Sequence, residues 1–363
     1  MAIELSRLRF NNGDDIVPRY SAEEVIRNTG DTNTLAGDDK ITGVGPGMRS
    51  SISDSGIYNS GTIEMDRGDD MITGTYDATE YSLHNANYIK LRPNNGRSIY
   101  KDNRGRTLYY PDDSIPLPVN SYGIYNSGTI NTGDGDDTIT GSNITGGYPI
   151  GRKIGLLDSL IDPVKGLIDP VNVFPGSVDR TYGAVAINNA GIINTGEGAD
   201  SVISNGRLIN WKMSLGKGND SIIAAAGFLN RSIENYTMID TGDDNDTITS
   251  YGVIYNNGEI NTGSGNDSII AYGGFESGLN NSGRVVLGEG NDSLYGFGSG
   301  DFDGGNDEDT LELTFGSYTV ESVGAAGVSF TNGSSVMKTT NFEILKAGSG
   351  TYDFASLFLG QKV

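Results

Sequence analysis

The sequence contains no cysteine and a single histidine, and this shortage excludes several kinds of functional site. Disulfide bonds and thiolate metal sites need cysteine, while catalytic triads and zinc sites usually need histidine. No apolar run reaches the length of a membrane-spanning helix, and residues 1–10 lack the apolar core of a secretory signal. We therefore expect no membrane span and no classical N-terminal export signal.

Basic residues are also scarce. The chain has 25 lysines and arginines against 47 acidic residues, a formal net charge of −22. This balance argues against a nucleic-acid partner and suits a protein that collects divalent cations. Apolar residues make up only 36% of the 363 residues, whereas glycine occurs 54 times. A solenoid fits this composition, because each coil buries a narrow apolar stripe and needs many tight turns.

The most informative feature is an internal repeat, whose clearest copy is NSGTINTGDGDDTIT from Asn126. The same register recurs from Asn28, Asn59, Asn189, Asn235, Asn256 and Asn281, with a shorter variant from Asn210. Its aligned aspartates are Asp39, Asp70, Asp137, Asp200, Asp220, Asp246, Asp267 and Asp292, followed by a weaker ninth copy at Asp309. The spacing of the later copies predicts one coil per repeat.

Each repeat alternates β-branched and polar residues in short segments that glycine and asparagine interrupt. Stacked coils would place like residues over like at about 4.8 Å, giving an inner isoleucine stripe and an asparagine amide ladder. We therefore predict an all-β protein, a right-handed parallel β-helix or β-roll-like solenoid of about eight coils over residues 23–295. Residues 1–22 would form an N-terminal cap, 75–120 and 141–182 two insertions, and 296–363 a C-terminal β cap.

The turn of each repeat has the composition of a calcium loop. Calcium prefers six to eight oxygen ligands at about 2.3–2.6 Å, and glycine lets a turn point its carbonyl groups inward. The aspartate at the sixth position would add a carboxylate. Candidate ligand residues are therefore the nine aspartates and the loop glycines Gly133, Gly135, Gly196, Gly198, Gly216, Gly218, Gly263, Gly265, Gly288 and Gly290. Metal-free Gly/Asp turns are the alternative, but many copies in one register favour several bound Ca²⁺ ions.

These turns resemble the nonapeptide G-G-x-G-x-D-x-U-x of the RTX, or haemolysin-type, family. Here threonine or leucine usually replaces the first glycine, and only Gly304–Gly305 restores the pair. The Asn-x-Gly-x-Ile halves look like repeats of filamentous-haemagglutinin-type adhesins. The resemblance implies one column of calcium ions along one edge, with the Asn-Gly bends opposite. The tail after residue 296 is similar to RTX tails that carry a type I secretion signal, which implies an extracellular or cell-surface protein.

Outside the repeats, the first insertion is basic and rich in tyrosine. It contains Lys90, Arg92, Arg97, Lys101, Arg104, Arg106, Tyr109 and Tyr110. These residues would either bind an acidic saccharide or another polyanion, or pack along the acidic loops through salt bridges. In the second insertion, residues 154–168 have near-helical apolar spacing. Residues 21–26 predict one helical turn, and 311–313, 318–320 and 327–330 predict antiparallel strands.

Two functions follow from this sequence. The first is a secreted structural or adhesive protein that calcium causes to fold, because unneutralised stacked carboxylates would repel one another. Its partners would be polysaccharides or cell-surface components. The second is a β-helix enzyme, similar to polysaccharide lyases or epimerases, that uses the basic insertion. No nucleophile and base are recognisable for it.

Overall fold

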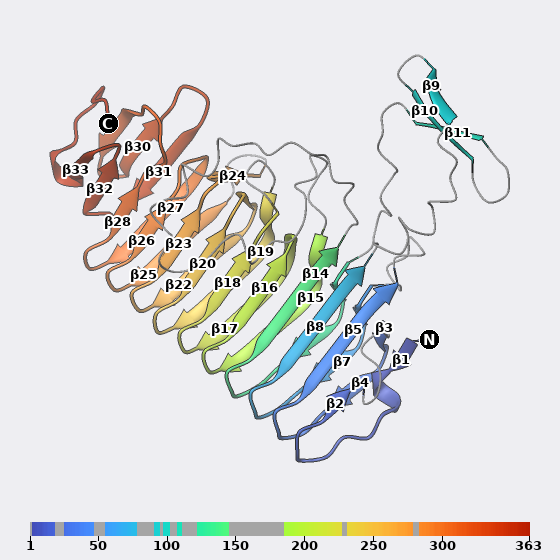
Figure 1. The fold of residues 1–363 in the computed structure, drawn as a ribbon. Coiled ribbons are helices and arrows are strands. Elements are labelled where there is room, and N and C mark those ends of the chain that lie inside the picture. Colours follow the sequence, from blue (N-terminus) through green and yellow to red (C-terminus); the bar gives the residue numbers. More distant parts are fainter. Residues whose placement is uncertain are drawn as a thin grey trace.

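The computed structural model describes residues 2–18, 25–46, 55–77, 91–94, 97–101, 107–110, 122–144, 185–226, 231–278 and 283–363. These residues form a parallel β-solenoid without an α-helix, with the N- and C-termini at opposite ends of the stack (Figure 1). The strands lie in an 18-stranded sheet, here sheet A, a 12-stranded sheet B and a separate 3-stranded sheet. The predicted all-β solenoid is confirmed.

Each coil crosses sheet A, turns through an acidic loop and returns through sheet B. Sheet A contains the parallel strands β1 (Ala2–Glu4), β3 (Val25–Asn28), β4 (Asp31–Asn33), β6 (Ile57–Asn59), β7 (Thr62–Glu64), β12 (Ile124–Asn126), β13 (Thr129–Asn131), β15 (Val185–Glu197), β17 (Arg207–Lys217), β19 (Arg231–Asp243), β21 (Val253–Asn256), β22 (Glu259–Ser264), β24 (Phe275–Ser277), β25 (Arg284–Glu289), β27 (Gly300–Asn306) and β31 (Val336–Thr340). Sheet B contains β2 (Ile16–Val17), β5 (Lys40–Pro46), β8 (Met71–Asp77), β14 (Thr138–Ile144), β16 (Ser201–Asn205), β18 (Ser221–Ala224), β20 (Thr247–Ser250), β23 (Ser268–Ala271), β26 (Ser293–Tyr295), β28 (Thr310–Glu312) and β32 (Ile344–Ala347).

The core consists of apolar rows that run along the solenoid axis. In sheet B one row passes from Ile41 through Ile72 and Ile139 to Val202, each residue paired in register with the next. A matching row in sheet A includes Ile130, which pairs with Ile63 and Ile193. The side chains of these residues are 0–1% exposed. The predicted inner stripe is therefore confirmed, and it holds the acidic loops in register.

A ladder of buried asparagines runs beside this core. The side-chain amide of Asn126 donates to the Asn189 side chain at 2.8 Å and accepts from Asn59 at 2.8 Å. It also donates to the backbone carbonyl of Ile192 at 2.9 Å. The predicted amide ladder is confirmed, but its placement opposite the acidic loops is wrong. The bend lies within sheet A, because β15 runs unbroken through Asn189.

The two ends of the stack differ from the expectations at several residues. Val25 and Ile26 begin the strand β3, so they are not part of a helical turn, and residues 21–24 lie outside the described part. Leu311 lies on β28, which pairs parallel to β26 and continues the solenoid, so it is not in an antiparallel strand. Antiparallel pairing begins with β29 (Thr319–Gly324) and β30 (Gly327–Thr331), and ends with β33 (Gly350–Asp353) on β32. These strands cover the last parallel coil.

Residues 75–77 and 141–144, at the expected starts of the two insertions, belong to the solenoid strands β8 and β14. Beyond them, the structure describes three short strands in the insertions: β9 (Leu91–Asn94), β10 (Arg97–Lys101) and β11 (Thr107–Tyr110). They form the small antiparallel sheet. The chain leaves sheet B after Asp77 and re-enters the solenoid at Tyr122, at the ends of strands far from the acidic loops (Figure 1). Residues 145–184, with the predicted near-helical segment, lie outside the described part.

Candidate calcium-binding face

The acidic loops share one backbone conformation, which we describe by positions one to nine of Thr132–Thr140. Glycines at positions two and four have positive φ angles, as in Gly133 at 104° and Gly135 at 144°. Where another residue occupies these positions, the left-handed conformation persists, as in Leu35 at 71° and Asp244 at 77°. Such angles cost about 1 kcal/mol or more for residues other than glycine. The loop shape is therefore set by the stack and not by glycine alone.

The predicted loop glycines form two columns along the solenoid, one at position two and one at position four. Gly196, Gly198, Gly216, Gly218, Gly263, Gly265, Gly288 and Gly290 all have φ angles between 96° and 142°. A side chain would also collide with the preceding coil, because a Cβ on Gly135 would lie 1.9 Å from the carbonyl oxygen of Gly68. Glycine here allows adjacent coils to approach closely.

The sixth-position aspartates form a continuous column, which we call the inner ladder. The Asp70 N–H donates to Oδ1 of Asp137 at 2.8 Å, and the Asp137 N–H donates to Oδ1 of Asp200 at 2.8 Å. The same bond links Asp39, Asp70, Asp137, Asp200, Asp220, Asp246, Asp267, Asp292 and Asp309 in order. All nine predicted aspartates are thus brought into one line.

The second carboxylate oxygen of each ladder aspartate makes no hydrogen bond of normal geometry. In five coils the threonine hydroxyl at position one, such as Thr132, still lies near enough to lower the pKa of its aspartate in part. The Oδ2 atoms of all nine residues are buried and unpaired, and the residues are at most 2% exposed. A buried carboxylate oxygen without a partner costs several kcal/mol unless a cation or donor meets it. The column of Oδ2 atoms therefore has the chemistry of a cation-binding face.

Burial has the expected effect on these carboxyl groups. Desolvation, with repulsion from carboxylates in neighbouring coils, raises the pKa of Asp70 to about 8. Desolvation likewise raises the pKa of Asp137 and Asp220 to about 7. The ionised ladder is therefore unfavourable in the protein alone, and a cation that binds it would replace the protons.

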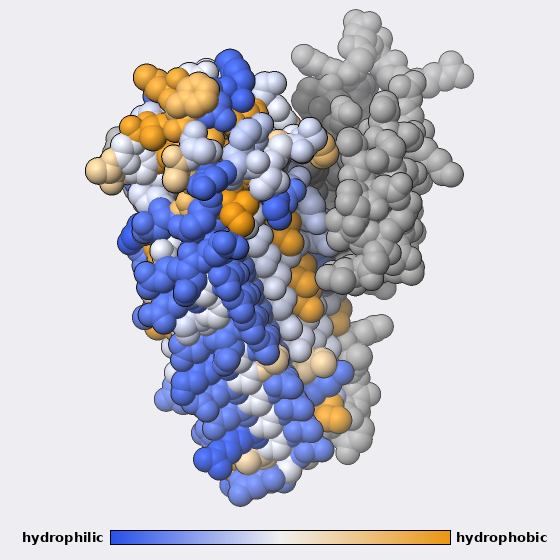
Figure 2. Space-filling model, turned by 90° about the vertical axis from the view of Figure 1, so that its left-hand side faces the viewer, coloured by the Kyte–Doolittle hydropathy of each residue, from blue (hydrophilic) through white to orange (hydrophobic). Residues whose placement is uncertain are grey.

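A second column lies at the exposed fifth position, which we call the outer ladder. Here each side-chain oxygen accepts a backbone N–H from the following coil, as Asp69 does from Asp136 at 3.0 Å. The first copies are aspartates, namely Asp14, Asp38, Asp69 and Asp136. After Ala199 the copies are asparagines, namely Asn219, Asn245, Asn266 and Asn291. The outer-ladder residues that accept these hydrogen bonds are therefore acidic only in the N-terminal half. Figure 2 shows the strongly hydrophilic surface of the side of the solenoid that bears the loops.

No point within the described residues brings together three acidic or histidine side chains as a ready-made metal cluster. A cation on the inner ladder would instead use one or two carboxylates and complete its shell with backbone carbonyl oxygens. Calcium accepts such mixed oxygen ligands. The donor set thus fits calcium better than it fits zinc, which prefers nitrogen and sulfur.

The inner ladder is longer than the sequence indicated. The Asp15 N–H donates to Oδ1 of Asp39 at 2.7 Å, and the Asp309 N–H donates to Oε2 of Glu343 at 2.8 Å. The sequence does carry a signal for Asp15, because Gly13-Asp14-Asp15-Ile16 is a shortened copy of the repeat. Glu343 has no glycine signature, and only the stacking of β32 on β28 reveals its place.

The described members of the predicted polyanion-binding set do not lie on this face. Arg92 lies on β9, Arg97 and Lys101 on β10, and Tyr109 and Tyr110 on β11. Lys90, Arg104 and Arg106 lie outside the described residues. The strands β9–β11 stand beyond the opposite edge in Figure 1, which gives no support to packing along the acidic loops. A polyanion site in this insertion stays a prediction.

No protein-family model and no curated protein matches the chain. Among solved structures, the chain is similar to one described as the X-ray crystal structure of a hyperactive, Ca²⁺-dependent, beta-helical antifreeze protein from an Antarctic bacterium. The two are 16% identical, the match covers 95% of this chain and 94% of that one, and the TM-score is 0.34. A likeness this weak transfers no property, and membership of the RTX family stays a prediction. In the described part of the chain, no helix is long and apolar enough to cross a membrane.

Proposed function

We propose that this protein is a calcium-stabilised β-solenoid that serves as a structural or adhesive scaffold outside the cell. The observation that carries the proposal is the column of nine buried Oδ2 atoms without hydrogen-bond partners. An unpaired carboxylate oxygen repeated in nine successive coils is difficult to explain as a turn residue, because a turn needs only Oδ1.

The inner-ladder aspartates would hold the ions through these oxygens, and backbone carbonyl groups of the loops would supply further ligands. Bound calcium would neutralise the buried carboxylates and remove the repulsion between adjacent coils. Because one ion would contact residues from stacked loops, its binding energy would become folding energy of the solenoid. The scaffold would then assemble where calcium is abundant.

Calcium titration of the full-length protein tests this proposal. We expect far-UV circular dichroism to change between excess EGTA and millimolar calcium, and the melting temperature to rise with calcium. Magnesium should raise it less, because Mg²⁺ demands octahedral geometry and dehydrates reluctantly. Identical spectra and melting curves in EGTA and calcium would refute the proposal.

An extracellular location and export through the C-terminal region belong to the same proposal. They are supported by the RTX-like repeat. Fusion of residues 296–363 to a reporter, in a host that has a type I secretion apparatus, should carry the reporter into the medium. Retention of the reporter in the cell would contradict this route.

A further inference from the structure

A row of aromatic side chains crosses three consecutive coils of sheet A, far from the basic insertion in sequence. Trp211 on β17 stacks on Tyr236 on β19, with ring centroids 6.4 Å apart and planes inclined by 22°. Tyr236 meets the ring of Tyr255 on β21 at 5.9 Å. Trp211 is 55% exposed and Tyr236 36%. We call these three rings the aromatic platform, in which Trp211 and Tyr236 are exposed and Tyr255 is half-buried.

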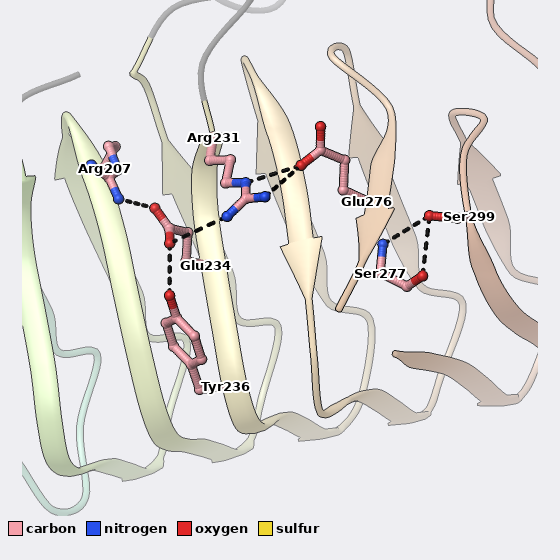
Figure 3. Close-up of polar contacts among 7 residues, drawn as sticks. All are labelled: Arg207, Arg231, Glu234, Tyr236, Glu276, Ser277 and Ser299. Carbon is pink, nitrogen blue, oxygen red and sulfur yellow. Dashed lines mark hydrogen bonds and ion pairs between the residues drawn. The ribbon is translucent and has the colours of Figure 1, made fainter. Parts of the chain in front are cut away.

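A charge cluster around the buried Glu234 holds the hydroxyl end of Tyr236 (Figure 3). The Tyr236 hydroxyl donates to Oε2 of Glu234 at 2.9 Å. The Glu234 side chain is only 4% exposed and also accepts a hydrogen bond from Arg207. Arg231 lies 3.9 Å from the same Oε2. The ring of Tyr236 is therefore held in one orientation before any ligand arrives.

A polar pair stands at the other end of the platform. The Arg231 guanidinium lies over the Tyr255 ring, 3.7 Å from its centroid. It also donates to Oε2 of Glu276 at 3.0 Å through Nε, and its NH2 group lies 2.8 Å from the same oxygen. The side chains of Arg231 and Glu276 are 40% and 51% exposed. Both therefore retain hydrogen-bonding capacity toward solvent or a ligand.

The coil itself does not require this cluster. In register, Glu234 is paired with Ile209 in one neighbouring coil and Tyr255 in the other, so uncharged residues fill the same position. A buried ion pair is often no more stabilising than apolar residues of similar size. The cluster is better explained as a device that orients the exposed rings than as a source of stability.

We propose that the aromatic platform and the Arg231–Glu276 pair bind a neutral polysaccharide. Sugar rings present apolar C–H faces that stack on aromatic rings, and their peripheral hydroxyl groups donate to carboxylates and accept from guanidinium groups. The near-parallel rings of Trp211 and Tyr236, on adjacent coils, suit neighbouring sugars of one chain, and the Arg231–Glu276 pair lies next to them beyond Tyr255. Neutral sugars fit because Arg207 and Arg231 are already paired with Glu234 and Glu276. The formal net charge of −22 further disfavours a polyanion.

This inference deepens the adhesive role proposed above and rests on it, but the platform does not itself use calcium. The sequence offers a direct probe, because Trp211 is the only tryptophan. Its fluorescence therefore reports on the platform alone. Hydroxyethylcellulose, galactomannan and dextran are suitable neutral probes, with alginate as the anionic comparison.

The test combines fluorescence with affinity electrophoresis of the calcium-loaded full-length protein. We expect at least one neutral polysaccharide to shift Trp211 emission to shorter wavelength and to retard the protein. Trp211→Ala and Tyr236→Ala should each weaken retardation by about tenfold or more, as aromatic anchors of binding sites do. Tyr272→Ala, in the half-buried stack with Tyr251, is the matched control and should leave retardation unchanged.

Glu234→Gln tests the positioning role separately. It should weaken retardation less than Tyr236→Ala, because the ring remains but its anchor is weakened. The inference is overturned if no neutral polysaccharide binds, if only alginate binds, or if the Trp211→Ala and Tyr272→Ala variants bind equally. Circular dichroism with and without EGTA on the same samples reports the calcium-stabilised fold, so failure of one proposal is distinguishable from failure of the other.

Discussion

Replacement of Asp137 by asparagine should stabilise the protein without calcium and destabilise it with calcium. Asparagine keeps the Oδ1 atom that accepts from the Asp70 N–H at 2.8 Å, and it replaces the unpaired Oδ2 by an uncharged amide group. In EGTA the substitution removes a buried charge that the fold disfavours. In calcium it removes a ligand from the proposed column.

The magnitudes follow from the burial of the carboxylate. Desolvation raises the pKa of Asp137 from 3.8 to about 7, which corresponds to about 4 kcal/mol against the ionised form. Solvent screening reduces this cost, and the unpaired buried amide of the asparagine adds a new cost of about 1–3 kcal/mol. The free energy of unfolding in EGTA should therefore rise by about 1 kcal/mol. When free calcium is at one hundred times the dissociation constant, one bound ion stabilises the folded protein by about 2.7 kcal/mol. The variant would lose this contribution.

Urea unfolding followed by circular dichroism at pH 8 measures both effects. The control is Asp136→Asn, since Asp136 is an exposed neighbour on the outer ladder and asparagine occupies that position in later coils. We expect the control to change stability by at most about 0.5 kcal/mol in either buffer. If Asp137→Asn and Asp136→Asn respond alike to calcium, the inner ladder does not bind the ion.

Four further predictions concern the loops. Asp244→Gly should stabilise the calcium-loaded protein by about 1 kcal/mol, because it relieves a φ angle of 77°. Gly135→Ala should destabilise it by at least about 2 kcal/mol, because its Cβ meets the Gly68 carbonyl oxygen. Melting temperatures that shift in the same direction for both variants would contradict the loop geometry. In EGTA, stability should fall as pH rises through the raised pKa values, about 8 for Asp70, because the folded carboxyl groups bind protons more tightly than the unfolded ones. A higher melting temperature in EGTA at pH 8 than at pH 5 would exclude this. Calcium should protect backbone amides before Ala199 from hydrogen exchange more than those after it, since the outer-ladder residues that accept hydrogen bonds are acidic only before Ala199. Equal protection in the two halves would refute this reading of the charge.

The sequence predicts the solenoid and its acidic edge well because both depend on residues that recur in register. Ile130 and Ile139 alternate with polar neighbours in a pattern that only a stacked strand explains, and Asp137 follows glycines whose spacing defines a turn. Asn126 likewise repeats at a fixed offset. Each of these residues stacks on copies of itself, so a periodic signal is enough to place it.

Features that depend on strand pairing could not be placed in this way. The Asn189 bend falls inside sheet A because β15 continues through it, which depends on strand pairing with β17 and not on local composition. Glu234 meets Arg207 because β17 pairs with β19 in the register that places Ile209 beside Glu234. This cluster leaves no repeated signature in the sequence.

The most direct test of the calcium ladder is the structure of crystals grown with calcium. Anomalous difference density should be recorded at a wavelength where calcium has a measurable anomalous signal. The account predicts a column of anomalous peaks beside the Oδ2 atoms of the inner-ladder aspartates, from Asp39 to Asp309. Loops with no peaks along that column, at saturating calcium, would contradict it.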